Sequence, residues 1–299
     1  MRSAGAPPVI CARQLCKPSP IKIFDVRRGC FMPQTKFWAE LTSSDFQARD
    51  MARSIVVLPV AATEQHGPHL PLGTDAMIMD GYIAMVITRL PDELPVLFLP
   101  VQNCGLSIEH INFPGTLSLS AKTTLRAWTE VCECVRRTGC RKLVLLNAHG
   151  GNSAVLEIIV HDLRARLNML AVIASWRHFG SPDGLFSPHE LAHGIHAGEI
   201  ETSLMLAFRP DLVRMKEAED FPCTSAEMER EFKWLRTGRP TGFGWMAQDL
   251  AASGAMGNAA VATARKGEAC ADYGVTAFIE LLQDIDGFDL NRLKEGPLT

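Results

Sequence analysis

The stretch Ser54-Ile55-Val56-Val57-Leu58-Pro59-Val60 and the loop after it, Glu64-Gln65-His66-Gly67-Pro68-His69-Leu70-Pro71-Leu72-Gly73-Thr74-Asp75, carry the strongest signal in this chain. The apolar run is typical of a buried strand. Glu64 and His66 are two residues apart, so on an extended backbone their side chains face the same side. The Gly and Pro residues that follow suit a tight turn that brings Asp75 back beside them. Carboxylates and imidazoles are ligands that zinc, manganese and iron(II) accept, so the loop predicts a metal site that activates water.

Further apolar runs and helical patterns alternate along the chain. This order predicts an α/β fold with a mostly parallel sheet and helices on both of its faces. Function in such sheets gathers at the carboxyl ends of the strands, where the polar clusters of this chain fall. The strands are expected at 55–60, 96–101, 142–147 and 171–176, and the main helices at 76–89, 121–137, 153–167, from 199 to before Pro210, and 268–282.

Composition narrows the class of protein. The 299 residues are 47% hydrophobic and 21% charged, with a formal net charge of −3. Without a basic excess we expect neither nucleic acid nor an anionic membrane as a partner. No apolar run reaches the roughly 18 residues of a membrane span. Nine cysteines without a CxxC pair favour a reduced, cytoplasmic chain over a disulfide framework.

The N-terminal part differs in composition from the rest. Residues 1–31 are rich in Pro and basic residues and predict a poorly ordered extension, with an upstream start codon or a transit peptide as alternatives. Residues 32–299 are expected to form a single domain. Within it, residues 216–263 have weak periodicity and predict loops and short elements rather than a second domain.

Three more polar clusters follow predicted strands. His149 lies between Asn147 and two glycines, either as a ligand or as an incidental residue of a turn. Glu109 and His110 lie in a loop after the second strand, where they contact substrate or are simply solvated. His196 precedes a predicted helix with Glu199 and Glu201 in its first turn, where a carboxylate also fits plain helix capping.

Together these segments resemble the creatininase family of metal-dependent amidohydrolases. The resemblance spans about residues 37–285. The matching segments are EQHGPHLPLGTD (64–75), the stretch 107–116 with its FPGT, NAHGGN (147–152), HAGEIETSLMLAFRPDLV (196–213) and ATARKG (262–267). It implies a single three-layer α/β/α sandwich, assembled into homo-oligomers that are often hexamers. It also implies a divalent metal centre, with two ions of zinc, manganese or iron per chain.

Site residues carry over from the family position by position. Glu64, His66, Asp75 and His149 match metal ligands, with Asp75 as the bridging carboxylate, and His196 matches the active-site histidine beside the metal. The remaining candidates around substrate or behind the ligands are Gln65, Glu109, His110, Gly151, Asn152 and Trp176.

The chain departs from creatininases proper at two positions. Gly151 stands where they carry a glutamate that binds the second metal, and we expect Glu199 to compensate as a ligand and to assist as a base. Ala192 stands where they carry a tryptophan over the substrate, and Trp176 is expected to keep an aromatic wall. These changes speak against creatinine itself as the substrate.

The predicted function is hydrolysis of a non-peptide C–N bond of a small amide, such as a cyclic amide, lactam or formamide. Metal-activated water attacks, and His196 passes a proton to the leaving nitrogen. Two alternatives lie within the family: deformylation of a formylaminopyrimidine nucleotide, with Arg177 or Arg265 as phosphate ligands, and trimming of a peptide precursor. An alternative of another class is a metal-stabilised sensor or scaffold without catalysis.

Overall fold

Four parallel strands form the central sheet, in the order β2-β1-β3-β4. The computed structural model describes residues 35–296. In it, β1 (Ile55–Val60) pairs with β3 (Lys142–Asn147) over six residues, from Ile55–Lys142 to Val60–Asn147. The strands β2 (Val96–Phe98) and β4 (Leu170–Ser175) form the two edges. The predicted α/β fold with a parallel sheet is therefore confirmed.

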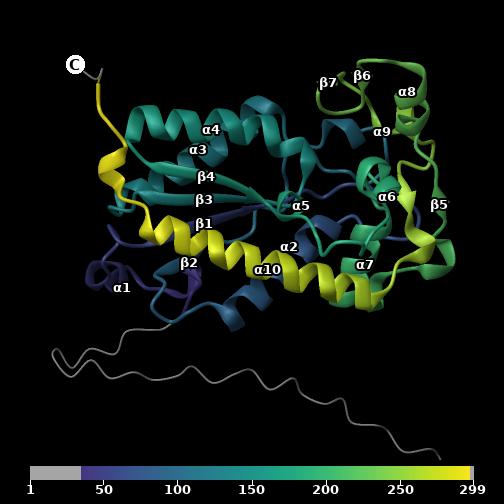
Figure 1. The fold of residues 1–299 in the computed structure, drawn as a ribbon. Coiled ribbons are helices and arrows are strands. Elements are labelled where there is room, and N and C mark those ends of the chain that lie inside the picture. Colours follow the sequence, from purple (N-terminus) through teal and green to yellow (C-terminus); the bar gives the residue numbers. More distant parts are fainter. Residues whose placement is uncertain (1–34, 297–299) are drawn as a thin grey trace, which may run out of the picture. The chain divides into compact units, whose positions relative to one another are not determined.

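Helices cover both faces of this sheet. One face packs against α3 (Ala121–Arg137) and α4 (Ser153–Leu167). The other packs against α2 (Thr74–Arg89), α7 (Glu199–Phe208) and α10 (Ala264–Gly287). Figure 1 shows α10 running along one side of the strands and α3 and α4 along the other. The result is the three-layer sandwich expected from the resemblance.

The central strand β1 explains why its sequence carries no polar alternation. Successive side chains point to opposite faces, so Ile55 and Val57 join the core beneath α2 and α10. Val56 and Leu58 join the core beneath α3 and α4. All four are fully buried, because a parallel strand between two helical layers has no solvent face.

Two helix starts follow from local capping. The hydroxyl of Ser120 accepts the backbone N–H of Thr123 at the start of α3. The hydroxyl of Thr263 does the same for the N–H of Lys266, so α10 begins at Ala264, four residues before the predicted start, and continues to Gly287. The predicted helix at 268–282 is correct in place and too short at both ends.

Strand β2 is shorter than predicted. It ends at Phe98 rather than at Val101, although Leu99 still donates its N–H to the Val57 carbonyl. Pro100 has no N–H to donate, so the ladder with β1 is interrupted there and resumes only as an isolated bridge between Val60 and Gln102. The other predicted strands are correct to within one residue.

Short elements fill the region beyond the carboxyl ends of the strands (Figure 1). Residues 216–263 hold loops and short segments, as their weak periodicity predicts. The described residues from Lys36 onward form one compact unit. The short helices of this region are α5 (Trp176–Phe179), α6 (Pro188–His193), α8 (Ser225–Glu231) and α9 (Ala247–Leu250), and its two-residue strands are β5 (Asp220–Phe221), β6 (Leu235–Arg236), β7 (Thr241–Gly242) and β8 (Gly257–Asn258). Helix α1 (Ser43–Ala48) lies at the opposite end of the sheet (Figure 1).

Two further sequence predictions concern the N-terminal extension and the absence of a membrane span. The expected extension at 1–31 lies outside the described residues. Among residues 35–296, no helix is both long and apolar enough to cross a bilayer.

Candidate metal centre

Buried carboxylates and imidazoles meet at the carboxyl end of the sheet. Glu64 and His66 follow β1, Asp75 lies in the first turn of α2, and His149 follows β3. The exposed fraction is 0% for Glu64 and His66, 3% for Asp75 and 5% for His149. Since an isolated buried charge is very costly, these groups require charged partners or a cation.

Asp75 stands between two imidazoles. Its Oδ1 is 3.2 Å from Nε2 of His66, and its Oδ2 is 3.5 Å from Nδ1 of His149. The same Nδ1 of His149 is 3.1 Å from Oε1 of Glu64. Each oxygen of the carboxylate therefore faces a different histidine.

A third carboxylate of the cluster belongs to Glu201 in the first turn of α7. Its Oε2 is 3.7 Å from Nε2 of His66 and accepts the backbone N–H of Ala197 at 2.6 Å. Ala197 has a φ of 55°, a conformation that non-glycine residues adopt rarely and that often marks functional sites. Glu201 thus completes the half of the cluster around His66.

The predicted ligand Glu199 lies elsewhere. Its carboxylate pairs with Lys266 of α10, and it does not belong to the groups of close ligand atoms that the described residues form. Residues two apart on an α-helix point about 200° apart, so the turn that aims Glu201 at His66 aims Glu199 away from it. The structure therefore does not bring Glu199, predicted as a compensating ligand and base, to the cluster, and Glu201 lies there instead.

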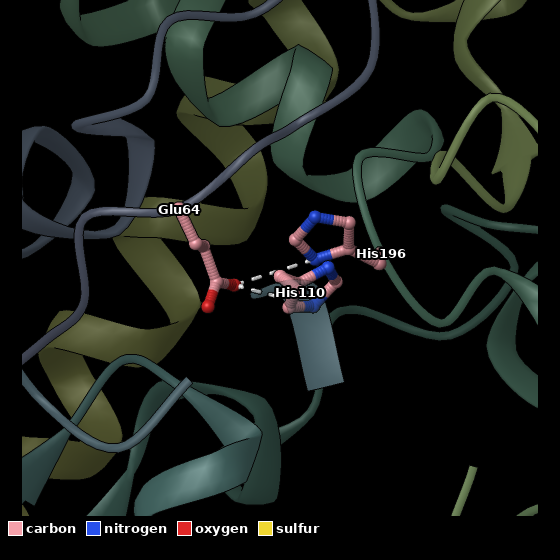
Figure 2. Close-up of side chains that lie close together, drawn as sticks. All are labelled: Glu64, His110 and His196. Carbon is pink, nitrogen blue, oxygen red and sulfur yellow. Dashed lines mark ion pairs between the residues drawn. The ribbon is translucent and has the colours of Figure 1, made fainter. Parts of the chain in front are cut away.

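Two further histidines face Glu64 (Figure 2). Nε2 of His110 is 3.6 Å and Nδ1 of His196 is 3.7 Å from Oε1 of Glu64. The two rings also face one another, with centroids 4.2 Å apart. His110, predicted only as a substrate contact, comes as close to Glu64 as the expected active-site histidine does.

Hydrogen bonds to backbone carbonyls set the tautomers of three rings. His66 donates through Nδ1 to the Glu64 carbonyl at 3.0 Å. His149 donates through Nε2 to the Leu106 carbonyl at 3.0 Å, and His196 donates through Nε2 to the Gln65 carbonyl at 2.6 Å. In each neutral ring the other nitrogen is an acceptor, and that nitrogen faces the carboxylates.

The side chain of Gln65 sets the tautomer of His110. Its Oε1 accepts the N–H of Gly67 at 2.9 Å, so its Nε2 is the donor to the Gly254 carbonyl at 3.0 Å and to Nδ1 of His110 at 2.7 Å. His110 therefore carries its proton on Nε2 and presents a donor to the cluster. This is the geometry of an orienting residue behind the site, which is the role predicted for Gln65.

Asn152 supports the cluster from behind His149. It donates to the side chain of Asn147 at 3.2 Å, and Asn147 in turn accepts the backbone N–H of His149 at 3.1 Å. Gly151 leaves room for Glu109, whose Oε1 is 3.3 Å from Nε2 of His149. A Cβ at position 151 would lie 2.4 Å from that oxygen, so the missing side chain and Glu109 compete for one space.

Charge coupling within the cluster shifts the pKa values in opposite directions. Burial alone lowers the pKa of His66, but Asp75 outweighs it and raises that pKa to about 9. Burial and the charge of Glu64 raise the pKa of Asp75 to about 6. Burial and the charge on His66 lower the pKa of His196, and burial and His196 lower that of His110 to about 3. Two kinds of histidine result: protonated rings among the carboxylates and neutral rings beside them.

The donor set fits a divalent cation. Four buried atoms of the cluster have no hydrogen-bond partner, and buried polar atoms without one are rare. They point toward one another, and a cation among them would replace the protons on His66 and His149. The orphaned atoms are Oε1 and Oε2 of Glu64, Nε2 of His66 and Oδ2 of Asp75.

A cavity of about 740 Å³ opens onto these side chains. Trp176 lines it and stacks on Tyr82 with ring centroids 3.9 Å apart, so its ring is a fixed part of the wall. Phe243 and Trp245 add aromatic surface from the irregular segment 216–263, where sequence periodicity offered no signal. His196, Glu201 and His110 face the same cavity.

Comparison with curated proteins finds relatives of two kinds. The creatinine amidohydrolase of Pseudomonas putida is 31% identical over 208 residues, which are 64% of this chain and 78% of that protein. The mycofactocin precursor peptide peptidase of Mycobacterium ulcerans is 36% identical over 165 residues, which are 53% of this chain. The chain spans 60% of the length of that peptidase.

Solved structures agree with these relatives. A crystal structure of creatinine amidohydrolase superposes with a TM-score of 0.69 at 26% identity, covering 85% of this chain and 99% of that chain. Other creatininase structures of similar likeness include a Zn–Zn form of a mutant and a manganese form. The sequence model described as creatinine amidohydrolase matches residues 39–282. This match spans most of the chain, and with the fold it shows that the protein belongs to the creatininase family.

Proposed function

We propose that this chain is a metal-dependent amidohydrolase that cleaves a C–N bond of a small amide, such as a cyclic amide, a lactam or a formamide. The observation that carries the proposal is the position of Asp75, whose two oxygens face His66 and His149 within a buried and otherwise unpaired ligand set. Zinc, manganese and iron accept these donors. When bound, such a pair of ions lowers the pKa of a coordinated water toward neutrality and polarises the carbonyl of the substrate.

The ligands divide into two halves that share Asp75. Glu64, Asp75 and His149 form one group of close ligand atoms. His66 faces the other oxygen of Asp75, and His66, Glu201 and His196 form a second group of close ligand atoms. We therefore propose two metals per chain, with Glu201 in the role that the sequence had assigned to Glu199.

The neutral histidines supply the proton transfers. His196 holds a proton on Nε2 against the Gln65 carbonyl, so its Nδ1 is free to accept a proton at the cluster and return it to the leaving nitrogen. His110 presents Nε2–H beside Glu64 and can donate to the carbonyl oxygen as negative charge develops there. Gln65 keeps both rings in these tautomers, one through its carbonyl and one through its amide.

A second candidate function has support from the comparisons. Identity is higher to the peptidase relatives, at 36%, than to the creatinine amidohydrolase, at 31%. A cavity of about 740 Å³ is at the large end of the sizes that hold drug-sized ligands, so a short peptide also fits its volume. Peptide trimming uses the same residues, because the attacked bond is again an amide.

Assembly into a homo-oligomer is part of the proposal. Ile108, which lines the cavity, is 62% exposed, and Ile111 and Leu117 of the same segment are 46% and 57% exposed; exposed large apolar side chains favour an interface between subunits. Analytical ultracentrifugation distinguishes the hexamer expected from the resemblance from a monomer.

Metal content tests the site directly. Elemental mass spectrometry of gently purified protein is expected to give about two divalent metals per wild-type chain. Glu201→Gln is expected to lower that number to about one, because a neutral amide binds such cations poorly. Glu199→Gln, on the same helix two residues away, is the matched control and should keep the wild-type content.

Turnover completes the test. Creatinine, hydantoin, simple lactams, formamides and short peptides are compared as substrates of the metal-loaded protein, with His196→Ala beside the wild type. Hydrolysis of one class that His196→Ala abolishes supports the assignment. Protein that binds no metal when zinc or manganese is added would overturn it and favour the scaffold or sensor.

A further inference from the structure

A second cavity of about 710 Å³ adjoins the first, and the geometry points to it as the binding site for an anionic group of the substrate, a carboxylate or a phosphate. This inference rests on the proposed function in one respect only: it assumes that the bond to be cleaved lies at the metal cluster. The inference specifies the charge of the substrate, about which the residues of the metal cluster say nothing.

The walls of this cavity carry a surplus of positive charge. Among the residues that line it, the only carboxylate is Glu229, whose Oε2 is 3.2 Å from Nε2 of His193. Glu229 is therefore engaged with a histidine rather than with the basic side chains. The cationic residues of the lining are Arg177, Lys233, Arg236 and Arg239.

Two of these arginines are held by backbone carbonyls instead of carboxylates. Arg177 donates to the carbonyls of Ile195 and Gly194 at 3.0 and 3.4 Å. Arg236 donates to the carbonyls of Phe232 and Leu235 at 2.7 and 2.8 Å. Such contacts orient a guanidinium without neutralising it, and its remaining N–H groups can pair with an incoming oxyanion.

The other two cations contribute in different degrees. Lys233 lies with its Nζ 5.5 Å from the ring centre of Trp234, a contact that also leaves its charge unneutralised. Arg239 is 96% exposed and 3.8 Å from Glu157, so it adds little. The site is thus built chiefly from Arg177, Lys233 and Arg236.

Shared walls connect this basic cavity to the metal cluster. Arg177, Ile195 and Trp245 line both cavities. Trp245 donates its ring N–H to the Thr237 carbonyl at 2.7 Å, and this hydrogen bond holds the ring in the wall that the two cavities share. Ile195 is followed directly by His196 of the cluster. A molecule whose amide lies at the cluster can therefore reach Arg177 with a group attached to it.

The chemistry of the cations selects the ligand. A guanidinium presents parallel N–H groups that match the two oxygens of a carboxylate or of a phosphate. A neutral cyclic amide has no group for this cavity and would leave it to water. The preferred substrate is therefore an amide that bears a carboxylate or a phosphate.

Matched substrates test this preference. N-formyl-β-alanine is compared with its neutral primary amide, and N-formyl-O-phosphoethanolamine with neutral N-formylethanolamine. The double variant Lys233→Glu, Arg236→Glu is expected to raise KM for the charged member of a pair by about tenfold or more, with kcat/KM for the neutral member unchanged. Lys122→Glu on α3, an exposed lysine that lines neither cavity, is the control for a charge reversal elsewhere on the surface. The pair that responds more strongly identifies carboxylate or phosphate.

A binding measurement separates this inference from the proposed function. Inorganic phosphate and succinate are titrated into the metal-loaded protein by calorimetry, which needs no turnover. Binding that weakens about tenfold or more in the double variant and not in Lys122→Glu supports the anion site even if no amide is hydrolysed. Anions that bind equally to wild type and double variant, or not at all, would overturn the site even if neutral amides are hydrolysed.

Discussion

The carboxylate of Glu109 occupies the space that a side chain at position 151 would need. This leads to a prediction that can be tested on the metal-free protein. A Cβ at position 151 would lie 2.4 Å from both Oε1 of Glu109 and Nε2 of His149, and 2.6 Å from the Leu106 carbonyl. At the preceding Gly150 a Cβ meets nothing within 4 Å. Both glycines lie in one short 3-10 segment, Gly150–Asn152, so Gly151→Ala and Gly150→Ala differ only in these contacts.

The magnitude follows from what the methyl group displaces. Alanine at an unstrained position gains about 0.4–1 kcal/mol because the unfolded chain loses freedom, and this is expected for Gly150→Ala. In Gly151→Ala the carboxylate of Glu109 must leave His149, which costs about 1.5–3 kcal/mol for a charge-assisted hydrogen bond. Movement of the Leu106 backbone adds about 1–3 kcal/mol. Gly151→Ala is therefore expected to be less stable than Gly150→Ala by about 3 to 6 kcal/mol.

Urea unfolding followed by circular dichroism measures this difference. A chelator is present throughout, because metal bound to the folded state would add its own stabilisation. The midpoint of Gly151→Ala should fall well below that of wild type, while the midpoint of Gly150→Ala stays equal or rises. Equal midpoints for the two variants would refute the packing of Glu109 against Gly151 and His149.

Three further predictions concern the framework around the site. Trp128→Ala should lower the free energy of unfolding, measured in urea, by about 3–5 kcal/mol, because this 2% exposed ring fills the core between α3 and the sheet. A loss under about 1 kcal/mol would contradict that packing. Glu190→Gln should lower the free energy of unfolding by about 1–3 kcal/mol. The Glu190 carboxylate accepts the backbone N–H groups of Glu199 and Asn258 at 2.7 and 2.9 Å, and the amide nitrogen of glutamine cannot accept a hydrogen bond. An unchanged free energy of unfolding would show that those bonds are dispensable. Burial raises the pKa of the Cys132 thiol from 9.0 to about 12, so the folded state keeps a proton that the unfolded state loses, and stability should fall as pH rises from 9 to 12. Cys132→Ala should flatten this alkaline slope, and an identical slope in both proteins would argue against the shift.

Local sequence patterns predicted the sheet and most of the helices, because the apolar periodicity and the capping residues of those elements lie within the elements or next to them. The run Ile55–Val60 is apolar throughout, the run Lys142–Asn147 is apolar between its two terminal residues, and α3 follows its own capping serine, Ser120. The predicted end of strand β2 at residue 101 was wrong, because pairing with β1 is interrupted at Pro100. Where this strand ends is determined by its pairing with a neighbour and not by local preference.

Helix geometry separates Glu199 from Glu201, although the comparison of the sequence with the family had predicted Glu199 as the ligand. Both lie in the first turn of α7, and either suits the positive end of the helix dipole. The direction of each side chain depends on how α7 is rotated against α10, which the pairing of Glu199 with Lys266 fixes. That contact joins residues 67 positions apart and leaves no local trace.

By itself, the sequence predicted the parallel sheet, the polar loop Glu64–Asp75 after β1 and the position of His149 after β3, because the apolar runs of the two central strands are local properties. Only the tertiary structure brought Glu201 to the cluster, turned the Nε2–H of His196 to the Gln65 carbonyl and that of His110 toward Glu64, and gathered Arg177, Lys233 and Arg236 around one cavity. These arrangements depend on contacts between segments far apart in the chain, whose energies come from packing and charge in the folded state rather than from any local pattern.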